Sequence, residues 1–234
     1  MQRRALLSGI AVGSVAALGG CSGVTLFEDR VEESRTSEFD PADGAPVGVQ
    51  NQNGDVAVGV HDGEQVVVDA TVAAPSDERL ADVSVDGGAS DGGFVVAVRV
   101  DGDSSGVSVA LDVQVPAGTA VASVQSENGD VDVRDVAGVA AAGSRNGDVS
   151  VRDAGPVGSV TTENGDVAAD VAATLSGDVT VQSTNGDAEA RVSPDVDADL
   201  WATTENGDVT VSGLDLTDRR ESRTEVRGGL GDGT

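Results

Sequence analysis

The chain has 234 residues, and its 41 acidic side chains against 14 basic ones give a formal net charge of −27. Such an acidic protein repels phosphate backbones, so the charge excludes nucleic acid as a general partner. With one cysteine and one histidine, the chain cannot build a disulfide framework, a zinc site of cysteine and histidine ligands, or a Cys-His nucleophile pair.

Residues 1–21 have the pattern of an export signal. Arg3 and Arg4 precede an uncharged run that is too short and too weakly apolar for a stable membrane span. The arginine pair is typical of a twin-arginine (Tat) signal. The tetrapeptide Leu-Gly-Gly-Cys that ends at Cys21 resembles a lipobox, where lipoproteins are cleaved so that the cysteine carries lipid. We therefore predict an extracytoplasmic protein that is anchored to the cell membrane by lipid on Cys21. An ordinary cleaved signal with an incidental cysteine is the alternative.

Acidic residues are spread along the whole chain rather than gathered in one block. Cleavage before Cys21 would leave 12 of the 14 basic residues against 41 acidic ones, a net charge of −29. Every basic residue is an arginine, because lysine is absent. This composition resembles that of proteins from extreme halophiles, which stay soluble where salt screens their charges. We therefore predict a halophilic protein, with an acidic polar tether over residues 22–37.

The segment after the tether predicts short strands separated by turns. Apolar residues alternate strictly over Val107–Val115, which is the clearest strand in the chain. Val66–Val68 and Phe94–Val100 are predicted strands as well, and Asp-Gly dipeptides mark the turns between them. Outside the signal segment no window has the apolar period of a long helix, and only the residues around Ala81 could hold a short helical turn.

From Val121 onward the sequence repeats around the tripeptide Asn-Gly-Asp. After a first copy at Asn53, the copies from Asn128 onward are 18, 18, 21 and 21 residues apart. Since asparagine and glycine both tolerate positive φ, each copy is predicted to form a structural turn. The predicted turn residues are Asn53, Gly54, Asp55, Asn128, Gly129, Asp130, Asn146, Gly147, Asp148, Asn164, Gly165, Asp166, Asn185, Gly186, Asp187, Asn206, Gly207 and Asp208.

Two architectures can use these turns. Each could close a hairpin in an antiparallel meander or β-sandwich, or form a corner of a β-solenoid whose coils stack about 4.8 Å apart. The apolar residues Val131, Val149 and Val167 keep the same register. A meander does not require this, so we predict an all-β solenoid with coils of 18–21 residues. Stacked asparagines would form favourable ladders, whereas stacked aspartates would repel unless salt or cations relieved them.

A resemblance to a known family rests on several quoted segments. They are Asn53-Gly54-Asp55-Val56, the strand that ends in Pro116-Ala117-Gly118, and Ser126-Glu127-Asn128-Gly129-Asp130-Val131. With these segments, residues 38–234 resemble the putative-adhesin family, a β-strand-repeat domain of unknown function, in a halophilic archaeal lipoprotein form. The resemblance implies a right-handed, single-stranded β-helix at the cell surface and brings no catalytic residue. Such domains usually continue past a Gly-Asp-Gly turn, whereas this chain ends at Thr234. We therefore expect a missing last coil or a fragment.

Calcium binding and glycan chemistry are the alternatives for function. Glycine-aspartate corners bind Ca²⁺ in nonapeptide β-rolls, but this repeat is twice as long, and Ser176-Gly177-Asp178 is its one echo of that spacing. We therefore predict no metal and no cofactor. Polysaccharide cleavage needs a marked pair of acids, and abundance alone marks none. Sugar sites usually use aromatic platforms, and the one tryptophan, Trp201, is predicted to be an interior or end-cap residue.

The sequence thus predicts a non-catalytic, surface-exposed lipoprotein that presents an acidic solenoid for adhesion or envelope scaffolding. Its predicted partners are the membrane, through Cys21, and a surface glycan or envelope protein. His61 is predicted to be a turn residue. The basic cluster of Arg219, Arg220, Arg223 and Arg227 is predicted to pair locally with Asp218, Glu221 and Glu225 rather than to dock a partner.

Overall fold

The computed structural model is built almost entirely of β-strands. It describes residues 30–42, 44–171, 178–193, 198–212 and 217–230. In these ranges the chain forms one nine-stranded sheet, called sheet A, and one ten-stranded sheet, called sheet B, with a single short helix. No helix in the described ranges is long and apolar enough to cross a membrane. The prediction of an all-β protein is confirmed.

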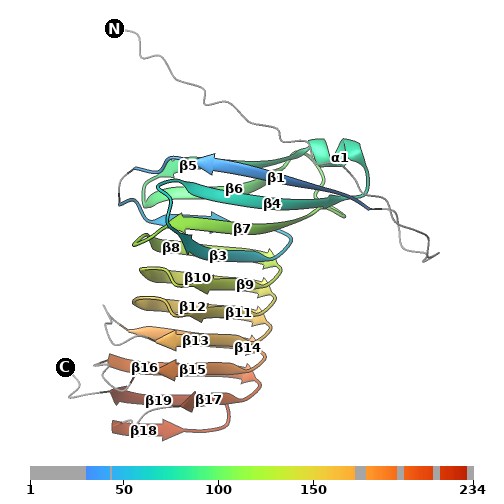
Figure 1. The fold of residues 1–234 in the computed structure, drawn as a ribbon. Coiled ribbons are helices and arrows are strands. Elements are labelled where there is room, and N and C mark those ends of the chain that lie inside the picture. Colours follow the sequence, from blue (N-terminus) through green and yellow to red (C-terminus); the bar gives the residue numbers. More distant parts are fainter. Residues whose placement is uncertain (1–29, 43, 172–177, 194–197, 213–216, 231–234) are drawn as a thin grey trace, which may run out of the picture.

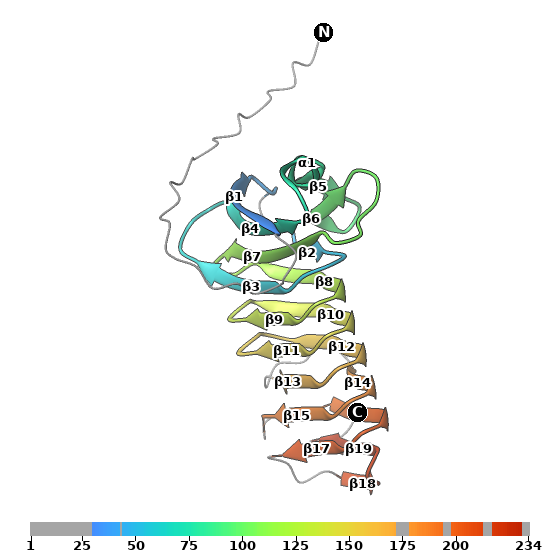
Figure 2. The same cartoon turned by 90° about the vertical axis from the view of Figure 1, so that its right-hand side faces the viewer.

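The Asn-Gly-Asp repeat forms a stack of parallel coils (Figures 1 and 2). Each coil gives one strand to sheet B, turns at the tripeptide, and gives a shorter strand to sheet A. Equivalent residues pair across neighbouring coils, so Val149 lies between Val131 and Val167. The repeat is therefore a solenoid and neither a meander nor a hairpin-linked sandwich. Its strands are β8 (Ala120–Asn128), β9 (Val131–Arg134), β10 (Gly138–Asn146), β11 (Val149–Arg152), β12 (Val157–Asn164), β13 (Val167–Val171), β14 (Val179–Asn185), β15 (Ala188–Val192), β16 (Ala198–Asn206) and β17 (Val209–Ser212).

The first Asn-Gly-Asp copy belongs to the same stack despite its distance in sequence. Strands β2 and β3 flank it and pair in parallel with β8 and β9. The chain then runs through β4, α1 and β5, rejoins the stack as β6, which pairs in parallel with β2, and continues as β7, which pairs in parallel with β3. Antiparallel pairs of β4 with β7 and β5 with β6 close this end. The elements are β2 (Val47–Gln50), β3 (Val56–His61), β4 (Val66–Ala74), α1 (Asp77–Ala81), β5 (Val83–Ser90), β6 (Gly93–Val100) and β7 (Ser108–Pro116).

The segment predicted as a tether is partly wrong, because strand β1 (Val31–Phe39) occupies its second half. This strand pairs antiparallel with β4 along its whole length. Arg35 ties it to the region around α1, donating to the carbonyls of Val83 at 2.6 Å and Leu80 at 2.8 Å. The Arg35 guanidinium also bonds Glu33 and lowers the pKa of that carboxyl. Polar side chains on the exposed positions of β1 hide its strand pattern in the sequence.

The core is a thin interior of valine and alanine between the two sheets. One buried row from sheet A runs through Val131, Val149, Val167, Ala188 and Val209. Burial of each valine contributes about 1.5–3 kcal/mol, so small residues suffice where every coil repeats the contact. Phe39 and Phe94 pack with ring centroids 5.7 Å apart at the N-terminal end, where the solenoid widens into its antiparallel strands.

A C-terminal hairpin covers one edge of the stack. Strands β18 (Thr217–Glu221) and β19 (Glu225–Leu230) pair antiparallel, and β19 pairs with β16 of sheet B. Backbone bonds from Thr204 to Thr224 and from Val209 to Arg223 join the hairpin to the last corner. The edge of sheet B that parallel stacking would leave open at β16 is thus paired.

Candidate functional site

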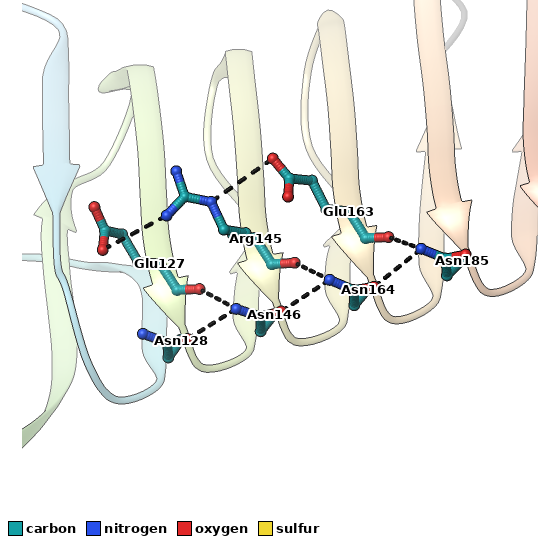
Figure 3. Close-up of polar contacts among 7 residues, drawn as sticks. All are labelled: Glu127, Asn128, Arg145, Asn146, Glu163, Asn164 and Asn185. Atoms are coloured by element: carbon teal, nitrogen blue, oxygen red, sulfur yellow. Dashed lines mark hydrogen bonds and ion pairs between the residues drawn. The ribbon is translucent and has the colours of Figure 1, made fainter.

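Six asparagine side chains form one continuous hydrogen-bonded row along the corners of the solenoid. From the second asparagine onward, each Nδ2 donates to the Oδ1 of the asparagine one coil nearer the N-terminal end, over 2.8 to 3.0 Å. Figure 3 shows the part of this row from Asn128 to Asn185. An amide carries a donor and an acceptor on separate atoms, so each asparagine inside the row can bond both of its neighbours. The members are Asn53, Asn128, Asn146, Asn164, Asn185 and Asn206.

The aspartate of each corner binds the backbone of the next coil. Asp130 Oδ1 accepts the backbone N–H of Asp148 at 2.8 Å, and the same bond recurs from Asp55 to Asp208 over 2.7 to 2.9 Å. Each charged oxygen therefore has its own N–H donor, which offsets the repulsion expected between stacked aspartates. At the last corner, Arg223 Nη1 lies 3.3 Å from Asp208 Oδ1.

Glycine and a buried hydroxyl complete each corner. A Cβ on Gly147 would lie 2.2 Å from the carbonyl oxygen of Gly129, so only glycine allows the backbones to approach this closely. The carbonyl of each corner glycine, from Gly54 to Gly186, then accepts a bond from a hydroxyl of the next coil over 2.7 to 3.1 Å. The hydroxyl residues are Ser126, Ser144, Thr162, Ser183 and Thr204, all of them buried.

A short row of opposite charges runs beside the asparagines (Figure 3). Arg145 lies between Glu127 and Glu163, with nitrogen-to-oxygen distances of 3.8 and 3.7 Å. All three side chains are about half exposed, so each pair stabilises the stack by no more than about 1 kcal/mol. Their importance is that the arginine partly neutralises this margin of sheet B.

Most outward positions of sheet B are uncharged. Parallel register places equivalent residues side by side, so these positions form rows, and two rows without charge run beside the charged row of Glu127, Arg145 and Glu163. We call these two uncharged rows the neutral face. Its first row is Ala141, Ser159 and Thr180, and its second row is Gln50, Gln125, Gly143, Thr161, Gln182 and Thr203.

The outer face of sheet A, by contrast, carries charge in most coils. Asp132 pairs with Arg134 on β9. Arg191 on β15 lies 2.9 Å from Glu189 and 3.7 Å from Asp170. The outer face of sheet A thus mixes acids with arginines, whereas the two rows of the neutral face hold no charged side chain in a chain of net charge −27.

A groove of about 650 Å³ marks the N-terminal part of the neutral face. Ala97 of β6 and the glutamines Gln50 and Gln125 line it, together with Gly143 and Thr161. The charged row of Glu127, Arg145 and Glu163 forms its margin. Side-chain amides and hydroxyls here can donate and accept hydrogen bonds without any net charge.

Trp201 closes the other end of the neutral face. It extends the row of Ser159 and Thr180, and 43% of it is exposed. Of the two predicted places for Trp201, interior or end cap, the interior is wrong, because Trp201 alternates with the inward-facing Leu200 and points outward beside the C-terminal hairpin. Arg227 of β19 lies over the ring, with Cζ 4.3 Å from the centroid, and pairs with Glu225. This stacking holds the indole in place.

The remaining predicted residues fall into three groups. Arg3, Arg4, Cys21 and the Ser176-Gly177 pair lie outside the described residues. His61 ends β3, and its Nε2 lies 2.8 Å from the carbonyl oxygen of Gln65. Local pairing in the basic cluster is confirmed for Arg219 with Glu221 at 2.7 Å and for Arg227 with Glu225. Arg223 instead meets the corner residue Asp208.

Metal ligands do not gather in the part of the chain that the structure describes: no three His, Cys, Asp or Glu side chains are grouped to hold an ion. In the next coil, each corner aspartate bonds to a backbone N–H rather than facing another carboxylate across an ion. The corners therefore use their carboxylates to join coils.

Sequence and structure comparisons give one family and several similar folds. A protein-family model described as Toastrack DUF4097 matches residues 45–233. No curated protein matches the chain.

Three solved structures illustrate the similar folds. One is a putative cell adhesion protein from Clostridium sporogenes, with a TM-score of 0.45 and 9% identity over 87% of this chain and 90% of that chain. A putative adhesin from Bacteroides fragilis has a TM-score of 0.35 and 14% identity over 78% and 97% of the two chains. A putative adhesin from Parabacteroides merdae has a TM-score of 0.29 and 10% identity over 78% and 97%.

Proposed function

This chain belongs to the Toastrack DUF4097 family, and we propose that it is a non-catalytic adhesion protein of the cell surface. In this proposal a lipid on Cys21 anchors a right-handed solenoid to the membrane, and the neutral face makes the adhesive contact. One observation carries the proposal: two neighbouring outward rows of sheet B hold no charged side chain from β8 to β14 in a chain with 41 acidic residues.

Rigidity supports this function. Every coil is joined to the next by an asparagine bond, an aspartate bond and a hydroxyl bond at the same corner. Coils that are joined this way hold their outward side chains in fixed rows. Binding a partner therefore costs this protein little conformational entropy. The outer face of sheet A carries acids and arginines that pair with one another, such as Asp132 with Arg134 and Glu189 with Arg191, whereas the neutral face offers an uncharged contact surface.

The anchor is tested by Cys21→Ser. We expect this variant to leave the membrane fraction and appear in the medium, because no lipid would then hold the exported protein. Fractionation followed by a high-salt wash measures it, with Ser22→Ala as the control for a change beside the cleavage site. Retention of Cys21→Ser in washed membranes would show that the anchor is something else.

The acidity is tested by removing salt. We propose that the protein is adapted to a high-salt environment, where its charges are screened to within a few ångströms. Transfer from molar to millimolar KCl should reduce the strand signal in circular dichroism, because self-repulsion among the acidic side chains then destabilises the coils. A strand spectrum that is unchanged across this range would contradict the adaptation.

A further inference from the structure

The neutral face has the length of a short extended polymer. It crosses six strands of sheet B, from β2 to β16, at a spacing of about 4.8 Å, which gives a length of about 24 Å. This spacing is close to the rise of one sugar residue in an extended chain. The two rows offer hydroxyls and amides from successive coils, such as Ser159, Thr161 and Gln182. Groups of these kinds match the alternating donors and acceptors of sugar hydroxyls.

Trp201 is the last residue of the first row of the neutral face, after Thr180. Arg227 covers one side of the indole, and the register places Thr180 on the opposite side. The side of the ring toward Thr180 therefore faces the small residues of the first row, Thr180 and Ser159, rather than another large side chain. An aromatic ring in this position can pack against the apolar face of a sugar, while the sugar hydroxyls bond to the hydroxyl and amide side chains of the two rows. Glu225 pairs with Arg227, and the exposed Asp199, two residues before Trp201 on β16, adds one negative charge at this end.

We propose that the neutral face binds an extended, uncharged glycan across its coils, with Trp201 as the stacking platform. This inference rests on the proposed adhesive function and names its ligand class. A uronic-acid polymer is disfavoured, because the protein carries a net charge of −27 and the face offers no unpaired arginine in its two rows. A neutral glycan needs no charge partner and avoids that repulsion.

The experiment follows Trp201 itself, which is the one tryptophan in a chain without tyrosine. Cellohexaose, mannohexaose and maltohexaose are titrated into the full-length protein, with hexagalacturonate as the anionic control. We expect at least one neutral hexasaccharide to shift the tryptophan emission and to protect it from acrylamide quenching in a saturable manner. Hexagalacturonate should change neither signal.

Variants then locate the site by calorimetry. Trp201→Ala should weaken binding about tenfold, and Trp201→Phe should fall between it and the unmodified protein. Thr210→Ala on the outer side of β17 should bind normally. Because Trp201 is substantially exposed, circular dichroism should be unchanged in all three variants.

Any of three binding results would overturn the inference. They are no saturable response to any neutral hexasaccharide, equal binding of hexagalacturonate, and full affinity in Trp201→Ala. Concentration-dependent dimerisation that Gln125→Glu abolishes would identify a second copy as the occupant and would also overturn it. If adhesion to cells depends on the neutral face while the hexasaccharides do not bind, the glycan inference fails and the proposed function stands.

Discussion

Gly147→Ala is expected to lower the free energy of unfolding by about 3 kcal/mol or more. The new Cβ would lie 2.2 Å from the oxygen and 2.5 Å from the carbon of the Gly129 carbonyl, and these are backbone atoms that cannot rotate away. Gly147 also has a φ of +150°, which a residue with a Cβ rarely adopts. Urea unfolding followed by circular dichroism measures the loss.

Gly88→Ala provides the matched control. Gly88 lies in strand β5, and a Cβ there meets no atom within 4 Å. We expect its stability to change by less than about 1 kcal/mol, and in the stabilising direction, because alanine restricts the unfolded chain. If Gly147→Ala were as stable as Gly88→Ala, close stacking at the corners would not hold the coils together.

Asn164→Asp is expected to cost about 2 kcal/mol. Asn164 Nδ2 donates to Asn146 Oδ1 at 2.9 Å, and the replacement places a carboxylate oxygen against that acceptor instead. The bond that Asn164 accepts from Asn185 remains possible, so the loss comes from the missing donor. Thermal and urea unfolding measure it.

Asn53→Asp is the control for added charge. Asn53 stands at the start of the row and accepts from Asn128 at 2.8 Å, while in the described residues its own Nδ2 donates to no acceptor. The substitution adds the same negative charge but keeps the accepting oxygen, so stability should change by less than about 0.5 kcal/mol. Equal losses in both variants would mean that charge, and not the direction of the hydrogen bonds, sets the cost.

The stacking of the coils could be predicted from the sequence, because the spacing of the Asn-Gly-Asp copies and the order of apolar residues between them both repeat. Val131, Val149 and Val167 share one register with their Asn-Gly-Asp copies, and a buried row in the structure confirms it. The family match likewise confirms the kind of domain that the resemblance implied. The copy at Asn53 shows the limit of this reasoning. It lies 75 residues before Asn128, and the strands between them hide that the two corners touch.

Two features could not be predicted from the sequence, for separate physical reasons, and a third could have been predicted. Strand β1 pairs its whole length through the backbone, which leaves no apolar pattern to detect. Trp201 follows the buried Leu200, and two adjacent large apolar residues do not reveal which one faces inward. The buried hydroxyls were detectable, since serine or threonine stands two residues before asparagine in five copies, such as Ser144 before Asn146. Their bond to glycine explains that pattern.

The neutral face as the adhesive surface is tested most directly by rebinding of the released protein to cells. In a Cys21→Ser background, Gln125→Glu with Gln182→Glu adds two charges to the neutral face, and Thr71→Glu with Ser212→Glu adds two to the outer face of sheet A. We measure the fraction of each secreted protein that pellets with intact cells. We expect the parent and the sheet A variant to pellet equally and the neutral-face variant to stay in the medium. Equal pelleting of all three proteins, or loss with the sheet A variant alone, would contradict it.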